Sequence, residues 1–537
     1  MKFKAIYLSV ALALALASCG TSKITAEPIT ITAPITAKKA PLTEAQEKRW
    51  SDLDLIKDSI PGMSVDRAYE LLKGKKSNKV IVGVVDSGVD INHPDLAPVI
   101  WTNTKEIANN GKDDDNNGYI DDVHGWNFLG DADNENLEFV RILKKGDDGS
   151  ATFKRAKAEY DKETTDAKTE LRKIDYIINA NNKIKAELKK DTYTAQDLQN
   201  LKSSDPLINE LKPQLSYILT QIPITELEKE LKEGKDHFED QLEYNLNLKF
   251  DGRKIVGDNP NDINDKKYGN NNVIGPKADG AKHGTHVAGI IAQTRGNNLG
   301  GDGVASNVAE IMAVRAVPNG DEYDKDVALA IRYAVDNGAK VINGSFGKYF
   351  STHSDWVYDA IKYAADKDVL IVCAAGNEGM NLNKNGKTAE RYPNDSRIGG
   401  PEIADNFLTI GALNPVYGEN MVAGFSNYGQ KEVDIFSPGV RIYATTPNNS
   451  YEFLQGTSMA SPNAAGVAAL IRAYYPKLTA SQVKRIIMDS GIAINLKVNV
   501  GENDDEATIP FSQASVTGKI VNAYNAIILA DKVSRGK

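Results

Sequence analysis

The feature that most constrains this chain is an apolar run, Val80–Val85, which stops abruptly at Asp86. A segment that is apolar at nearly every position indicates a parallel strand buried on both faces, between layers of helices. The run Val369–Ala375 repeats the pattern and ends in Gly376 and Asn377. Because ligands of open α/β sheets bind at the carboxyl ends of the strands, both endings are well placed for chemistry.

Two further segments put a reactive side chain at the start of an apolar helix. His283 precedes one such run, and Ser458 precedes another that covers residues 464–470. The first N–H groups of a helix have no partner within the helix, so they favour negative charge that develops beside them. Both segments are therefore suited to carry reacting groups.

The segments around Asp86, His283, Asn377 and Ser458 resemble those of the subtilisin-like serine proteases, or subtilases. The three reactive residues also follow the order Asp, His, Ser that is typical of subtilisin. This resemblance implies an α/β fold with a doubly wound, mainly parallel sheet. It further implies a serine endopeptidase that cleaves proteins or peptides through an acyl-enzyme.

The expected roles follow from the chemistry of each side chain. A serine hydroxyl is a weak nucleophile at neutral pH, so Ser458 needs a base, and His283 is the candidate. Asp86 would orient the imidazole and stabilise the imidazolium that forms. Asn377 and the backbone N–H of Ser458 would stabilise the oxyanion of the tetrahedral intermediate. This chemistry requires no cofactor.

The resemblance also implies a substrate groove with two walls. Backbone pairing with a peptide in such a groove gives affinity with little sequence selectivity. The expected substrate-binding residues are Ser345, Phe346 and Gly347 on one wall, and Ala374, Ala375 and Gly376 on the other.

Other classes of function fit the sequence less well. An esterase would be expected to carry the motif Gly-x-Ser-x-Gly, whereas Ser458 lies in Gly-Thr-Ser-Met-Ala. A catalytically silent relative, acting as a binding module, is disfavoured because all the catalytic residues are present. His286 follows His283 by three residues, but no third acidic or cysteine ligand accompanies them, which favours a structural histidine. A net charge of -9 argues against a nucleic-acid partner.

The first residues have the form of an export signal. Two lysines precede an apolar stretch that is too short to span a bilayer. The stretch ends in Leu-Ala-Ser-Cys19, which resembles the lipobox of bacterial lipoproteins. The resemblance implies that residues 1–18 are removed and that lipid on Cys19 anchors the protein to a membrane of the bacterial cell envelope. A plain secretory signal with a chance cysteine is the alternative.

The remaining chain divides into three parts. Residues 19–57 are predicted to be a tether, since much of this stretch is rich in Thr, Ala, Pro and Lys and has no hydrophobic periodicity. A peptidase domain is expected over 58–530, and the family resemblance covers about 58–128 and 250–530. Residues 129–249 form an insertion between Asp86 and His283.

The insertion has the character of helices. Residues 151–249 contain a single glycine, and apolar residues recur at helical spacing. We expect the helices to bend or break near Pro206, Pro213 and Pro223. No chemistry is apparent in this region. It is either a passive helical excursion or a surface that contacts a partner or restricts the access of substrates.

An acidic stretch before the insertion matches part of a calcium-binding loop. Its first, third and fifth positions and the glycine that follows agree with an EF-hand loop. The last position would be His124 in place of the usual glutamate, so a solvated acidic turn is the alternative. The predicted ligands of a structural calcium ion are Asp113, Asp115, Asn117 and Asp121.

Overall fold

The computed structural model describes residues 23–383, 390–397, 400–502 and 506–536. Residues 1–18 and Cys19 lie outside this part of the chain. The described strands form a nine-stranded sheet in the order β10-β13-β7-β6-β5-β4-β1-β3-β2. Every neighbouring pair in it is parallel except β10–β13. The bounds are β1 (Val80–Asp86), β2 (Gly125–Asn127), β3 (Ala309–Arg315), β4 (Val341–Gly344), β5 (Leu370–Ala374), β6 (Phe407–Leu413), β7 (Ile435–Pro438), β10 (Ile492–Ala493) and β13 (Lys519–Ile520).

Helices cover both faces of the sheet, which confirms the predicted α/β class. Along β1, Val82 and Val84 join one buried cluster and Val85 joins another, because successive side chains of a strand point to opposite faces. One face is covered by α3 (Val65–Leu72), α10 (Lys282–Ala292), α13 (Thr457–Tyr474), α14 (Ala480–Ser490) and α15 (Ala523–Val533), and the other by α11 (Asp324–Asp336) and α12 (Ser354–Asp366).

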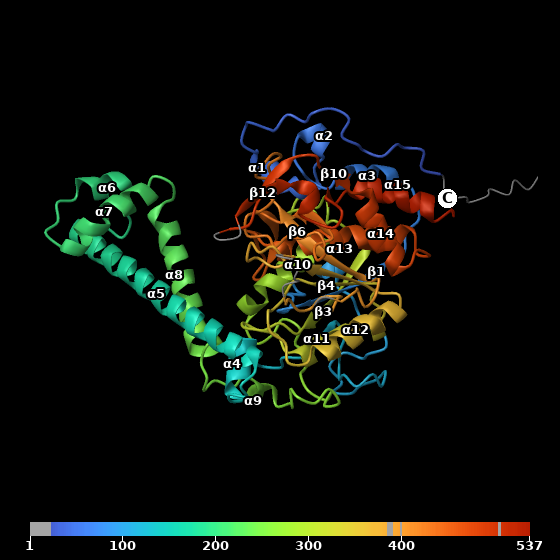
Figure 1. Ribbon diagram of the computed structural model, residues 1–537, viewed down its shortest axis with the longest axis horizontal. Helices are drawn as coiled ribbons and strands as arrows, with labels where there is room; N and C mark the ends of the chain where they lie inside the picture. The colour runs from blue at the N-terminus through green and yellow to red at the C-terminus, as the bar shows by residue number, and fades with distance from the viewer. Residues whose placement is uncertain (1–22, 384–389, 398–399, 503–505, 537) are drawn as a thin grey trace, which may run out of the picture.

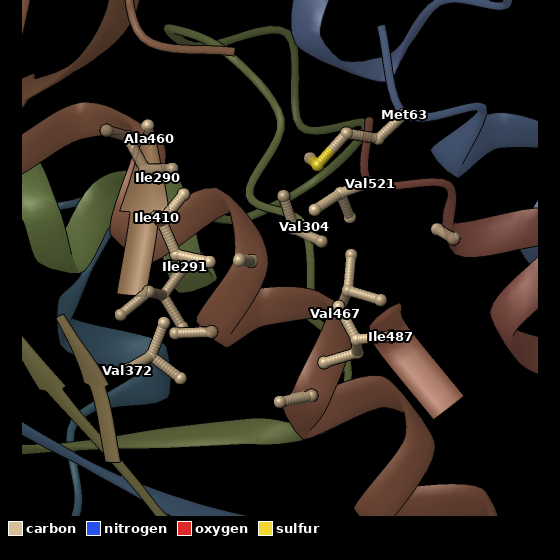
Figure 2. Close-up of a cluster of buried hydrophobic side chains, with 14 of the residues drawn as sticks. Met63, Ile290, Ile291, Val304, Val372, Ile410, Ala460, Val467, Ile487 and Val521 are labelled. Carbon is tan, nitrogen blue, oxygen red and sulfur yellow. The ribbon is translucent and has the colours of Figure 1, made fainter. Parts of the chain in front are cut away.

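Helix α13 lies at the centre of the larger core. Its Ala460 and Val467 point into a cluster that includes Ile290 and Ile291 of α10 and Ile410 of β6 (Figure 2). This packing places the first turn of α13 beside the ends of the central strands.

The smaller elements are α1 (Glu44–Glu47), α2 (Leu55–Asp58), α9 (Arg253–Val256), the hairpins β8 (Ile442–Thr446) with β9 (Ser450–Leu454) and β11 (Lys497–Val500) with β12 (Ala507–Pro510), and the short turns η1 (Trp50–Asp52), η2 (Ala97–Val99), η4 (Ala278–Ala281) and η7 (Phe511–Gln513).

The segment assigned to a tether lies against the body in its described part, from residue 23 onward (Figure 1). The N–H of Ile24 donates to Asp531 at 3.1 Å, and that of Ile29 donates to Asn525 at 2.7 Å, both acceptors being on α15. Both isoleucine side chains are buried. Isolated isoleucines in an extended segment have neither helical nor strand periodicity, so the sequence pattern did not indicate this packing.

The insertion forms an arm that projects from the body (Figure 1). Its proximal helix, α4 (Glu138–Lys144), lies on the body, whereas α5 (Ala151–Leu188) and α8 (Ile224–Asp240) run side by side away from it. The short helices α6 (Ala195–Asn200) and α7 (Pro206–Ile218) close the far end, and the π-helical turn η3 (Gln241–Asn245) returns the chain to the body.

The prolines of the arm act in two ways. Pro206 begins α7 and Pro223 is the N-cap of α8, both positions where a missing N–H is harmless. Pro213 lies inside α7, which continues through it, so the helix does not break at this residue. No helix among the described residues combines the length and the apolarity needed to cross a membrane.

Candidate active site

Asp86 and His283 meet at the end of the central sheet. Asp86 is the last residue of β1, and His283 lies in the first turn of α10. The imidazole Nδ1 is 2.7 Å from Asp86 Oδ1. A Cβ atom at Gly284 would lie 2.2 Å from the carbonyl oxygen of Gly88, so only glycine permits this approach of α10 to the strand end.

The environment of this pair orients the imidazole. Asp86 is 1% exposed and also accepts a hydrogen bond from the N–H of Ser87 at 2.7 Å. Desolvation lowers the pKa of His283, but the charge of Asp86 and its hydrogen bond outweigh that effect, so the pKa lies above its usual value. Because Asp86 holds Nδ1, the nitrogen left for chemistry is Nε2.

Ser458 lies in the first turn of α13 and contacts Ser345. Its Oγ donates to the carbonyl oxygen of Ser345 at 3.1 Å, and Ser345 Oγ donates to the carbonyl oxygen of Ser458 at 2.8 Å. In the described part of the chain, no hydrogen bond joins Ser458 to His283. Ser345 and His283 line the same cleft, and Ser458, which is hydrogen-bonded to Ser345, lines the adjoining pocket.

The amide of Asn377 is held by the residue that precedes Ser458. Its Oδ1 accepts hydrogen bonds from the N–H of Thr457 at 2.8 Å and from the Thr457 hydroxyl at 2.9 Å. The carboxamide is thereby fixed with Nδ2 left to donate elsewhere. Sequence reasoning did not single out Thr457, although its place beside Ser458 was a usable signal.

The predicted groove residues separate into two hollows. A pocket of about 210 Å³ is lined by Ser458 and Asn377, together with Phe346, Gly347, Ala374 and Gly376. Ser345 lines a larger cleft of about 690 Å³, on the side of His283. Ala375 is fully buried in the core, and it is not among the residues that line either hollow.

Charged residues that the sequence did not indicate also line the smaller pocket. They are Asp321, Glu322, Glu378 and Arg391. Arg391 is separated in sequence from every motif, so no local pattern connected it with the site.

The base of the arm forms part of the larger cleft. Asp240 of α8 and Tyr244 of η3 line it, as does Asn319 of the body. Asn319 Nδ2 donates to Asp240 at 3.2 Å, and Asn245 Nδ2 donates to the carbonyl oxygen of Asn319 at 2.9 Å. The insertion therefore reaches the edge of the site, as its position between Asp86 and His283 in the sequence predicts.

Buried charges join helix α4 to the segments behind the pocket. Arg141 donates to the carbonyl oxygens of Asp321 at 2.9 Å and of Glu322 at 3.1 Å. Lys348 Nζ lies 3.1 Å from Glu138 and donates to the carbonyl oxygen of Glu322 at 2.7 Å. Burial raises the pKa of Glu138, but the charges of Arg141 and Lys348 outweigh that effect and lower it to about 2. These contacts connect the base of the arm to the segment of Asp321 and Glu322, which lines the pocket.

The acidic loop gathers a different set of carboxylates from the predicted one. Oxygens of Glu106, Asp113 and Asp115 all lie within 4.8 Å of one another. Glu106 is 9% exposed, and its buried Oε2 has no hydrogen-bond partner among the described residues. Glu106 precedes the loop motif, so sequence reasoning missed it. The cluster offers the hard oxygen ligands that calcium prefers.

Two predicted ligands, Asp121 and Asn117, accept hydrogen bonds from N–H groups of the loop. Asp121 accepts hydrogen bonds from the N–H groups of Asn110 at 3.0 Å and Gly111 at 2.9 Å. Asn117 Oδ1 accepts from the N–H of Tyr119 at 2.8 Å. Asp121 therefore closes a turn of the loop, while Glu106 takes a place in the cluster.

Two other candidate groups are buried and inert. His286 Nε2 lies 3.0 Å from the carbonyl oxygen of Glu452, and burial lowers the pKa of this histidine to about 3. Cys373 is buried in β5, and burial raises the pKa of its thiol to about 12. Both side chains stay neutral near neutral pH.

Comparisons with known proteins place the chain in a family. The model of the subtilase family matches residues 77–508. A thermophilic serine proteinase from Bacillus sp. (strain AK1) is 42% identical over 190 residues, which are 35% of this chain and 42% of the relative. Subtilisin DY from Bacillus licheniformis is 38% identical over 223 residues, or 41% of this chain and 72% of the relative. The match thus spans less than half of the first relative's length.

A solved structure of proteases from Pseudoalteromonas arctica is also similar. It is 28% identical, with a TM-score of 0.37, and the match covers 46% of this chain and 70% of that chain.

Proposed function

The chain belongs to the subtilase family, and on that premise we propose that it is a serine endopeptidase that hydrolyses peptide bonds of proteins. The observation that carries the proposal is the 2.7 Å contact between His283 Nδ1 and Asp86 Oδ1. This contact orients a base at the edge of the sheet where Ser458 lies in the first turn of α13. A serine, an oriented base and an adjoining pocket are the parts that acyl transfer needs.

The first half of the reaction forms an acyl-enzyme. Rotation about the Cα–Cβ bond turns the Ser458 hydroxyl from the Ser345 carbonyl toward His283. Its proton passes to Nε2 while Oγ attacks the carbonyl carbon of the substrate, and Asp86 stabilises the imidazolium. The C–N bond then breaks as His283 gives the proton to the leaving amine.

The second half releases the product acid. His283 takes a proton from water, whose oxygen attacks the ester carbon, and returns the proton to Ser458 Oγ as the ester bond breaks. In both halves the oxyanion would accept hydrogen bonds from Asn377 Nδ2 and from the N–H of Ser458. In subtilisin, loss of one such donor lowers kcat by about 10²–10³-fold. We expect a similar loss in Asn377→Ala with the fold unchanged, measured by turnover and circular dichroism.

The test of the activity uses the purified mature protein. Denatured casein should be cleaved, and a fluorophosphonate should abolish cleavage while adding one label to Ser458, located by peptide mass spectrometry. Asn463→Ala, a change in the buried part of α13, serves as a control that keeps the nucleophile. Cleavage that persists after complete labelling would contradict the proposal.

We also propose that Glu106, Asp113 and Asp115 bind a structural calcium ion. The orphaned buried oxygen of Glu106 supports this, because a buried carboxylate oxygen without a partner is costly. Calcium at a hundred times its Kd would stabilise the fold by about 2.7 kcal/mol. Thermal unfolding with calcium or with EDTA should show this difference in the wild type and in Asp121→Asn, and should show none in Asp113→Asn. A calcium response lost in Asp121→Asn alone would contradict this ligand set.

The membrane anchor remains a further proposal. Lipid on Cys19 would hold the body close to the bilayer, since Ile24 is already bound to α15. The five residue steps from Cys19 to Ile24 span at most about 18 Å, at ~3.6 Å for each step. Mass spectrometry of the mature protein should find acyl chains on Cys19, and Cys19→Ser should leave residues 1–18 uncut. An unacylated N-terminus at another residue would contradict the anchor.

We propose that the arm restricts which proteins reach the cleft. The positions of Asp240 and Tyr244 in the cleft lining support this role. An unidentified protein partner of the arm and a passive helical excursion are the alternatives, and removal of the tip separates control of access from both.

A further inference from the structure

The pocket beside Ser458 contains a buried cation with an unused donor. Arg391 is 4% exposed, and its Nη1 donates to the carbonyl oxygen of Pro393 at 3.1 Å. Its Nη2 is buried and has no hydrogen-bond partner in the described part of the chain. A Cβ atom at Gly347 would lie 3.8 Å from this Nη2, so the guanidinium lies directly against one wall of the pocket. A buried charged donor without a partner is costly, which suggests that a ligand completes it.

The carboxylates of the pocket do not neutralise Arg391. Glu378 accepts hydrogen bonds from the hydroxyl of Tyr349 and from Asn427 Nδ2, the latter at 2.7 Å. Asp321 accepts from the N–H of Glu138 at 2.7 Å. Among the described residues, neither carboxylate forms an ion pair with Arg391.

Glu322 is the third carboxylate, and its Oε1 is also buried without a partner. Burial raises the pKa of Glu322 above its ordinary value, which favours the neutral form of this carboxyl group. In its protonated form it can donate a hydrogen bond to an anion. The unpaired Nη2 of Arg391 therefore offers a carboxylate a charged partner in the wall of the pocket.

We propose that this pocket selects an acidic residue, Asp or Glu, as the residue whose carbonyl carbon Ser458 attacks. Its carboxylate would accept a charge-assisted hydrogen bond from Arg391 Nη2, the pairing that guanidinium groups make best. A pocket of about 210 Å³ with Gly347 and Gly376 in its walls leaves room for such a side chain. This inference rests on the proposed peptidase function, and it names the substrate class of that same site.

The test compares four fluorogenic peptides that differ only at the residue before the scissile bond, which is Glu, Gln, Lys or Leu. We expect the wild type to cleave the Glu peptide with a kcat/KM about 10- to 100-fold higher than that of the Gln peptide. This is the difference that one hydrogen bond between charged groups contributes. Arg391→Gln should abolish this preference, and Arg391→Lys should restore part of it. Arg397→Gln is the matched control, because that side chain is 60% exposed and pairs with Asp355; it should keep the wild-type preference.

Two results would overturn the inference. One is a wild-type preference for Lys or Leu, and the other is an unchanged preference in Arg391→Gln. The wild-type comparison decides the question alone if that variant does not fold. Fluorophosphonate labelling and casein cleavage separate the two proposals. If both are observed but the Glu peptide is not preferred, only the proposed selection of an acidic residue fails. With both absent, the peptidase function itself fails.

Discussion

The base of the arm and its tip belong to one insertion but are held in place by different forces. The base comprises α4, the part of α5 up to Asp175, and the return of the chain from residue 233 through η3. Its Arg141 and Glu138 are buried and reach the segments behind the substrate pocket. The tip, residues 176–232, closes on its own apolar cluster. That cluster includes Ala180, Ile184, Leu198, Ile208, Leu215, Ile224 and Leu231.

The ion pairs of the two parts differ accordingly. In the tip they lie at the surface, as between Lys190 and Asp197, and exposed pairs contribute about 0–1 kcal/mol each. In the base, the pairs along α5 are exposed as well, but at α4 Arg141 pairs with Glu138 in the interior. Loss of one partner there leaves a buried charge unpaired, which costs about 3–5 kcal/mol. One end of the insertion therefore lines the cleft of the body, whereas the other end packs around an apolar cluster of its own.

The largest effect should come from removal of the proposed nucleophile in the body. The effects of changes in the arm are compared with this loss. Removal of the serine of such a triad in subtilisin lowers kcat by about 10⁶-fold. We expect a loss of this order in Ser458→Ala, measured as turnover of denatured casein, with thermal unfolding unchanged. Near-normal turnover in this variant would refute the assignment of the nucleophile.

The next largest effect should come from the base. Arg141→Met leaves Glu138 buried with one cation fewer, so we expect the free energy of unfolding to fall by about 3–5 kcal/mol. The pocket wall at Asp321 and Glu322 should loosen with it and lower kcat/KM. Arg172→Met is the control, since this residue is exposed on α5. Equal effects of the two changes in urea unfolding would show that the buried pair at α4 is no more important for stability than an exposed residue of α5.

A moderate effect should follow from pH. The pKa of His283 lies above its ordinary value of 6.5, and the base must be neutral to accept a proton. We therefore expect kcat/KM for a small peptide ester to rise about tenfold per pH unit below that pKa and then to level off. A midpoint at or below 6.5 would contradict the raised pKa. Removal of the tip should leave the midpoint unchanged.

The smallest effect on chemistry should come from the tip. Replacing residues 176–232 by a short Gly/Ser loop keeps the ion pair of Asp175 with Lys235 and everything nearer the body. Turnover of a small peptide ester should stay within about twofold, because surface changes away from the site have little effect. Cleavage of folded proteins, or the preference among them, should shift.

The control for this deletion is a longer one. Joining residue 130 to 250 would also remove Arg141 and Asn245, so it should impair the ester reaction as well. If the short deletion folds cooperatively and still loses ester turnover, the tip supports the catalytic geometry and the proposed control of access is wrong. If protein substrates are cleaved as before, the arm serves a partner or is passive.

The sequence by itself determined the parts of the molecule that depend on local pattern. The apolar runs predicted the strands that end at Asp86 and beside Asn377, and the near absence of glycine predicted a helical insertion. The order of the motifs indicated the family, because each motif combines a reactive side chain with the turn or helix start that positions it. Each apolar run and each motif is encoded within about ten consecutive residues, where strand and helix periods apply.

Only the tertiary structure decided which distant residues meet. Glu106 joins the acidic loop, Arg391 enters the pocket beside Ser458, and Ile24 lies along α15. Arg141 contacts Glu322 across more than a hundred residues of sequence. A buried charge is stable only with partners that surround it in space, and those partners are selected by the packing of whole helices and strands. No period or motif near these residues records that choice.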